Sequence, residues 1–137
     1  MNQHPYLRAY MAGIVVPTLV LLVAATVFTF ARYVYNVPVP IERVIVFPLA
    51  IVPNLWGLWN IIYIALPAPR HVSLGLFGAA MPFLLLPGAW LVTRLVDFPV
   101  PAIVAHVVPY GFPFAVIVYY LVWKHMVGRL NAIIGIA

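Results

Sequence analysis

The most polar stretch within the apolar part of this chain runs from Asn54 to Tyr63. Trp56, Asn60 and Tyr63 are spaced four and three residues apart, which places them on one face of a helix. We favour the interpretation that Asn60 makes an interhelical hydrogen bond that fixes packing. The alternative is a ligand or permeation site in which Asn54 and Asn60 bind a solute between aromatic walls.

A second candidate group consists of Arg94, Asp97 and His106. Arg94 and Asp97 follow one apolar segment and His106 lies one turn into the next, so all three are expected at the same membrane edge. Histidine changes its protonation state near neutral pH, so His106 is a conceivable proton carrier. We favour the simpler interpretation, which is a loop salt bridge beside a packed neutral histidine.

Several kinds of chemistry have no residues to support them. The chain has no cysteine, which excludes disulfides, thiolate nucleophiles and cysteine-bound metals. Its two acidic residues, Glu42 and Asp97, both fall in predicted loops, and no phosphate-binding glycine loop or His-Glu-x-x-His motif occurs. We therefore expect no enzyme activity, no metal site and no cofactor.

Four long apolar segments must position these residues, and none of the four contains a carboxylate. About 20 apolar residues suffice for a helix to cross a hydrocarbon core of about 30 Å. The chain is 66% hydrophobic and 7% charged, with a mean hydropathy of +1.13, whereas soluble domains are about 25% charged. These features predict a single-domain, all-α membrane protein over residues 1–137: an up-down four-helix transmembrane bundle, with spans at about 9–31, 44–66, 72–93 and 102–123 and a C-terminal tail at 124–137.

Prolines inside the apolar segments predict kinked helices, because proline lacks a backbone N–H and clashes with the preceding turn. These kinks could act as hinges, but we favour static kinks. The prolines concerned are Pro17, Pro48, Pro53, Pro82, Pro87, Pro109 and Pro113.

Two stretches of the sequence resemble each other. At an offset of 61 residues, Asn36–Pro48 parallels Asp97–Pro109, and both contain Pro-Val-Pro. A duplication would give two tandem helical hairpins, as in transporters with parallel repeats. Coincidence in a chain with fourteen prolines explains the similarity equally simply, and we favour it.

The charges indicate how the chain sits in a membrane. Seven basic residues give a formal net charge of +5, but they are spread over several loops, so no nucleic-acid partner is expected. Four spans place both termini on one side, and that side carries the larger number of basic residues, which favours cytoplasmic termini. We expect an integral protein of a bacterial cytoplasmic membrane. The basic residues are Arg8, Arg70, Lys124 and Arg129 on the side of the termini, and Arg32, Arg43 and Arg94 on the other.

Three functional classes remain. The absence of a buried charge favours a small multi-pass membrane protein with a structural, scaffolding or accessory role, whose partners are the lipid bilayer and a larger membrane complex or further copies of itself. The internal prolines and the two asparagines, Asn54 and Asn60, instead favour an oligomeric small-solute transporter or channel. An intramembrane enzyme or cofactor carrier is the least favoured class.

Overall fold

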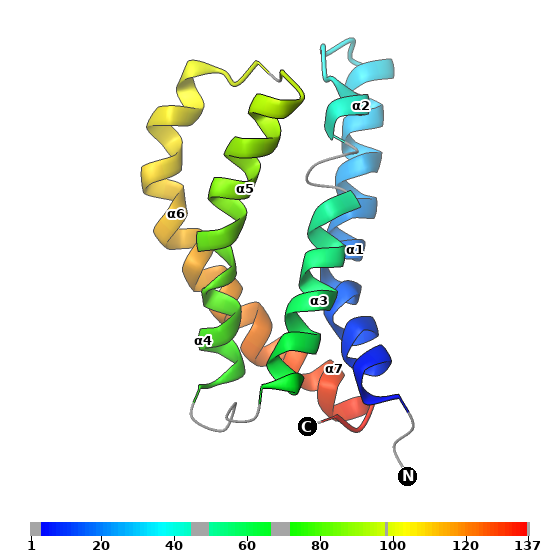
Figure 1. Ribbon diagram of the computed structural model, residues 1–137. Helices are drawn as coiled ribbons and strands as arrows, with labels where there is room; N and C mark the ends of the chain where they lie inside the picture. The colour runs from blue at the N-terminus through cyan, green and yellow to red at the C-terminus, as the bar shows by residue number, and fades with distance from the viewer. Residues whose placement is uncertain (1–3, 45–49, 67–71, 98, 137) are drawn as a thin grey trace.

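The computed structural model describes residues 4–44, 50–66, 72–97 and 99–136, and within these ranges the chain is helical and contains no strand. The long helices run alternately in opposite directions (Figure 1). The predicted all-helical fold class is therefore confirmed. The helices are α1 (Pro5–Tyr33), α2 (Ile41–Val44), α3 (Ile51–Ala65), α4 (Leu74–Ala79), α5 (Met81–Leu95), α6 (Ala102–Val122), the π-helix η3 (Trp123–Val127) and α7 (Gly128–Ile133).

Three helical segments are long and apolar enough to cross a membrane: Pro5–Tyr33, Leu74–Leu95 and Ala102–Ile133. The second of these consists of α4 and α5, and the third runs from α6 through η3 to α7. Helix α3 has 15 residues, so it is about 22 Å long, which is less than a hydrocarbon core of about 30 Å. Residues 45–49 of the predicted second span lie outside the described residues, so the fourth crossing stays a prediction.

The predicted span 72–93 is divided into α4 and α5 at Ala80. Ser73 caps α4, because its hydroxyl accepts a hydrogen bond of 3.3 Å from the Leu76 backbone N–H. Two residues after the division, Pro82 has no N–H to donate to the Gly78 carbonyl. Helices α1, α5 and α6 continue through Pro17, Pro87, Pro109 and Pro113. The predicted kinks there stay a prediction, and Pro48 lies outside the described residues.

The helices associate as two pairs, α1 with α3, and α4–α5 with α6. Glycines allow close approach in each pair, of two backbones in the first and of a backbone and a tryptophan side chain in the second. A Cβ atom on Gly13 would lie 2.6 Å from the Trp56 carbonyl oxygen and 2.9 Å from the Gly57 Cα. In the second pair, a Cβ on Gly78 would overlap the Trp123 side chain. Small residues therefore set the spacing of both pairs, as is common between helices in membranes.

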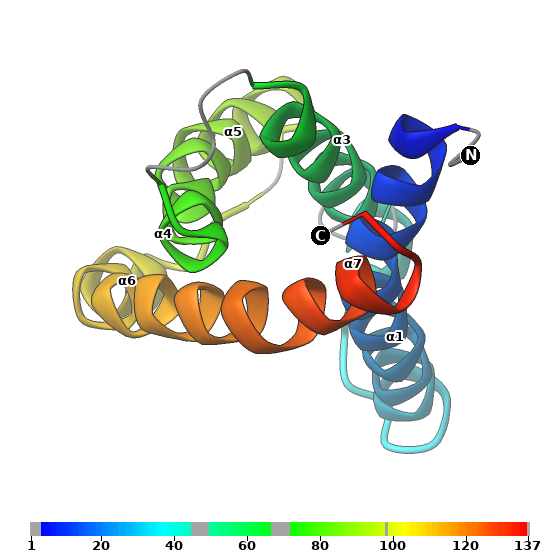
Figure 2. The same ribbon diagram turned by 90° about the horizontal axis from the view of Figure 1, so that it is seen from below.

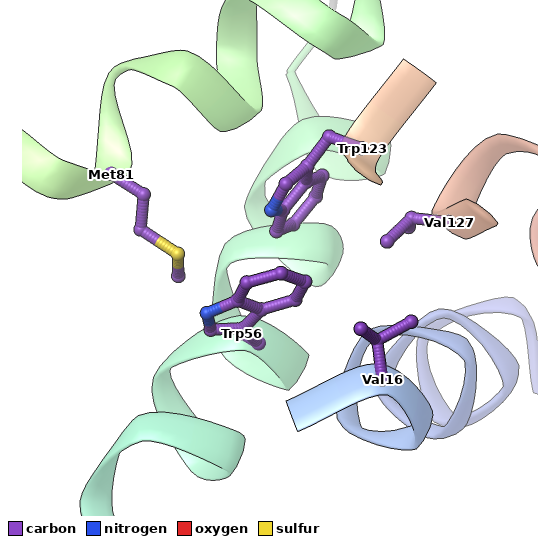
Figure 3. Close-up of a cluster of buried hydrophobic side chains, with 5 residues drawn as sticks. All are labelled: Val16, Trp56, Met81, Trp123 and Val127. Carbon is purple, nitrogen blue, oxygen red and sulfur yellow. The ribbon is translucent and has the colours of Figure 1, made fainter. Parts of the chain in front are cut away.

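The core lies where the two pairs meet, and its side chains point toward one another from three helices and η3 (Figure 3). It consists of Val16 from α1, Trp56 from α3, Met81 from α5, and Trp123 and Val127 from η3. The ring centroids of Trp56 and Trp123 are 5.3 Å apart. Helix α6, by contrast, has no buried residue. The contact between the pairs is therefore concentrated around two tryptophans, and most of the apolar surface faces outward.

The two similar sequence stretches share backbone features. Asn36 and Asp97, which correspond at the offset of 61 residues, have φ angles of 55° and 50°. Asparagine and aspartate are among the few residues that readily adopt this left-handed region. Helices begin at Ile41 and Ala102, which also correspond. Part of the first stretch, 45–48, lies outside the described residues, and the duplication itself stays a prediction.

Candidate functional site

Asn60 lies at a fully buried junction of three helices. Its Nδ2 donates to the Asn131 Oδ1 of α7 at 2.8 Å and to the Ala9 carbonyl oxygen of α1 at 2.8 Å. Asn131, also buried, donates from its Nδ2 to the Asn60 Oδ1 at 3.1 Å. Both hydrogens of the Asn60 amide are therefore used, and α1, α3 and α7 are joined by one polar contact.

This amide junction lies near the end of the molecule that carries both termini. Ala9 is four residues beyond the first residue of α1, which corresponds to about 6 Å along the helix. Close by, the Arg8 guanidinium donates a hydrogen bond of 3.2 Å to the Ile134 carbonyl oxygen. The C-terminal segment is therefore held against the start of α1 directly by Arg8 and indirectly through Asn60. The predicted span 44–66 would instead place Asn60 nearer the middle of the bilayer.

Asn54 is not brought together with Asn60. Its amide is exposed, donates to the Ala50 carbonyl oxygen at 2.6 Å and accepts a hydrogen bond from the Tyr10 hydroxyl. Six residues separate the two asparagines on α3, and six steps of about 100° place them on different sides of the helix. The solute site that would use both amides has no support in this arrangement.

The two aromatic members of the first predicted group pack between helices. Trp56 belongs to the core, and its buried Nε1 has no hydrogen-bond acceptor among the described residues. The same is true of the Trp123 Nε1. The Tyr63 hydroxyl donates to the Val72 carbonyl oxygen at 3.5 Å, and its ring centroid is 5.2 Å from that of Phe77 on α4. Their surroundings are those of packing residues.

Arg94, Asp97 and His106 each contact a different group. The Arg94 guanidinium lies 5.2 Å from the centroid of the Trp90 ring. The Asp97 backbone carbonyl accepts a hydrogen bond of 3.2 Å from Arg43. The His106 Nδ1 lies 3.2 Å from the Ala102 carbonyl oxygen. Among the described residues no hydrogen bond or ion pair joins the three side chains to one another, so a proton-transfer group at this edge stays a prediction.

An ion pair lies at the same end of the molecule, between α1 and α2. The Arg32 Nη1 is 3.1 Å from Glu42 Oε1 and 3.3 Å from Oε2. A hydrogen bond with its own backbone amide, together with the neighbouring Arg32 guanidinium, lowers the pKa of Glu42 below its ordinary value. Glu42 remains exposed, so this pair is a surface interaction that connects two helices.

Three apolar clefts lie between the helices, one within the second pair and two between the pairs. One of about 470 Å³ lies between α5 and α6, one of about 350 Å³ between α3 and α5, and one of about 380 Å³ among α1, α3 and α6. No Asp, Glu, Lys, Arg or His lines any of these three clefts. In the part of the chain that the structure describes, no group of three His, Asp or Glu side chains could hold a metal ion.

The sequence did not identify Asn131 as the partner of Asn60. One signal was available, since a buried amide needs a polar partner and Asn131 is a lone amide in the apolar tail. The pairing also depends on η3, because a π-helical turn changes the direction in which the following residues point.

The chain matches no family model, no curated protein and no solved structure.

Proposed function

We propose that this chain is a multi-pass integral membrane protein in which the three long apolar segments and α3 cross the bilayer. The large side chains on the outer surface of the long helices support this proposal. Val23 on α1 is 66% exposed, Leu95 on α5 is 75% exposed and Phe114 on α6 is 68% exposed. Water would disfavour such a continuous apolar surface, whereas lipid tails solvate it.

We propose a structural, scaffolding or accessory role rather than an enzymatic one. The observation that carries this conclusion is the Asn60–Asn131 pair, because the buried polar groups bind one another instead of facing a cavity. A path for polar solutes needs hydrogen-bonding or charged groups along its wall. The clefts between the helix pairs offer almost only hydrocarbon surface.

The proposed setting is the bacterial cytoplasmic membrane, with both termini on the cytoplasmic side and no nucleic-acid partner. The two termini lie at the same end of the molecule (Figure 1), which supports a common side for both. The clefts open between helices that contact each other little, which favours further helices as partners, from a larger membrane complex or from additional copies of this chain.

An oligomeric transporter or channel is the alternative function. The clefts between the helix pairs favour it, as do the prolines inside α1, α5 and α6, since these helices can bend where a backbone hydrogen bond is missing. The apolar lining restricts this alternative to apolar or amphipathic solutes, unless an oligomer contributes further polar groups.

Purification in mild detergent followed by reconstitution separates the two functions. The accessory role predicts copurification with a larger membrane partner and no solute flux when the pure chain is placed in liposomes. The transport function predicts a defined homo-oligomer and measurable flux. Flux that Asn60→Leu abolishes, with expression, helicity and oligomeric state preserved, would establish the alternative.

A further inference from the structure

A cleft of about 320 Å³ at the end carrying the termini combines two basic side chains with an apolar wall. Arg129 and His125 line it from α7 and η3, and Val15, Val16 and Leu19 line it from α1. Figure 2 shows the C-terminal helix crossing α1 at this end of the molecule. In the described part of the chain, the side chains of Arg129 and His125 make no hydrogen bond or ion pair.

The apolar wall continues along α1 beyond this cleft. Leu19 also belongs to a second cleft, of about 480 Å³, that follows α1 as far as Phe28 and is lined only by apolar residues. One leaflet of a bilayer has a hydrocarbon thickness of about 15 Å, which about ten helical residues cover. With the predicted span beginning near residue 9, the wall from Val15 to Leu19 lies in the leaflet on the side of the termini.

No side-chain carboxylate competes for the basic groups at this end. The only two acidic residues of the chain, Glu42 and Asp97, lie at the opposite end, on α2 and after α5 (Figure 1). The Arg129 guanidinium therefore has no side-chain carboxylate near it and is complementary to an anion.

We infer that this groove binds an anionic phospholipid. Arg129 binds the phosphate, His125 supplies a further contact, and one acyl chain lies along α1 past Leu19. A guanidinium group matches phosphate geometry, because it donates two parallel hydrogen bonds. The inference rests on the proposed membrane location, and with cytoplasmic termini the groove faces the leaflet in which anionic lipids are enriched.

The test has two stages, so that the two proposals can fail separately. The purified chain is first reconstituted and floated with liposomes; failure to float contradicts the membrane location, and the lipid site with it. Native mass spectrometry then compares retention of phosphatidylglycerol and phosphatidylcholine with identical acyl chains. We expect about fivefold preferential retention of phosphatidylglycerol, because both lipids carry a phosphate but only phosphatidylglycerol presents a net negative charge to Arg129. Equal retention of the two lipids by a chain that floats overturns the lipid site alone.

Variants locate the site. Arg129→Gln should remove the preference, whereas Arg94→Gln, which loses the same charge at the opposite end, should keep it. Leu19→Trp, which fills the junction of the two clefts, should weaken retention of phosphatidylglycerol. If Arg129→Gln loses its helical circular dichroism, His125→Gln replaces it with the same expected direction. If a folded Arg129→Gln variant still prefers phosphatidylglycerol over phosphatidylcholine, the inference is contradicted. It is also contradicted if inorganic phosphate competes for the site as strongly as the lipid does.

Discussion

Asn60 and Asn131 lie 71 positions apart in the sequence and exchange two amide hydrogen bonds, of 2.8 and 3.1 Å, at a fully buried junction. This pair connects α3 to α7, and the third bond of Asn60, to the Ala9 carbonyl, adds α1. The C-terminal segment is therefore held by specific polar contacts in addition to apolar packing. Its removal should affect the packing of the first helix pair.

Asn131→Leu should lower the stability of the folded chain in detergent. The substitution leaves the Asn60 carbonyl oxygen without a donor and one amide hydrogen without an acceptor, which costs about 1–3 kcal/mol for a buried group. Asn60→Leu should cost more, because it also removes the donor to Ala9. Thermal unfolding followed by circular dichroism measures both. Asn54→Leu, which loses only exposed hydrogen bonds to Tyr10 and Ala50, should cost less because water replaces them.

The double variant Asn60→Leu/Asn131→Leu should lose less free energy of unfolding than the two single variants lose together. Replacing both members of a buried pair leaves no unpaired amide from either, so the two effects are coupled. Measured coupling energies for hydrogen bonds between helices in membranes average about 0.6 kcal/mol. If the changes in free energy of unfolding of the two single variants add up to that of the double variant, the two amides do not interact in the folded protein.

Gly13→Ala should destabilise the chain, whereas Gly88→Ala should be neutral or stabilising. A Cβ on Gly13 would meet the backbone of Trp56 and Gly57, which cannot move aside without separating α1 from α3. Overpacking of this kind costs about 1–3 kcal/mol. A Cβ on Gly88 would meet no atom within 4 Å, so alanine there gains up to about 1 kcal/mol of helix propensity. The difference between the two melting temperatures is the measurement, and equal shifts would contradict the close packing of α1 on α3.

The carboxyl group of Glu42 should titrate below its ordinary range. Its pKa is lowered by its backbone amide hydrogen bond and by Arg32, so Arg32→Gln should return the pKa only part of the way. The pKa of Glu42 is lower in the folded chain than in the unfolded chain. The ion pair therefore stabilises the folded chain fully when the pH is above the ordinary carboxyl pKa, and this stabilisation is lost as the pH falls through the folded-state pKa. Carboxyl carbon NMR gives the titration directly. An identical titration in wild type and Arg32→Gln would exclude the ion pair.

Both ends of the molecule can be mapped with single cysteines, because the natural chain has none. His4→Cys lies before α1 and Tyr35→Cys lies after it, and both positions are exposed. In intact cells a membrane-impermeant maleimide should label Tyr35→Cys at once and His4→Cys only after permeabilisation. The reverse pattern would contradict the proposed orientation, and labelling of both in intact cells would contradict the crossing of α1.

Composition was sufficient to predict helices, because a chain this apolar can satisfy its backbone groups in lipid only within helices or a closed barrel. The boundaries were less predictable. The span expected at 72–93 is divided at Ala80. Pro82, two residues further along the chain, has no backbone N–H to donate to the preceding turn. The tail from Lys124 onward continues the last helix, through the π-helix η3. A π-helical turn has no recognisable signal in a single sequence.

The candidate site was only partly predictable for a similar reason. Asn60 was singled out as an amide within an apolar segment, but its partner Asn131 depends on tertiary packing. Arg94, Asp97 and His106 were grouped because they share a membrane edge. The depth of a residue in the membrane does not determine which way its side chain points. Arg94 lies beside the Trp90 ring, and His106 lies beside a carbonyl oxygen of its own helix.

The most direct test of the membrane location is extraction of native membranes with alkaline carbonate. This treatment releases soluble and peripheral proteins and leaves proteins whose helices cross the bilayer. We expect the full chain to remain in the membrane pellet and to become soluble only when detergent is added. Release of the chain into the carbonate supernatant, folded and free of lipid, would contradict the proposed membrane location.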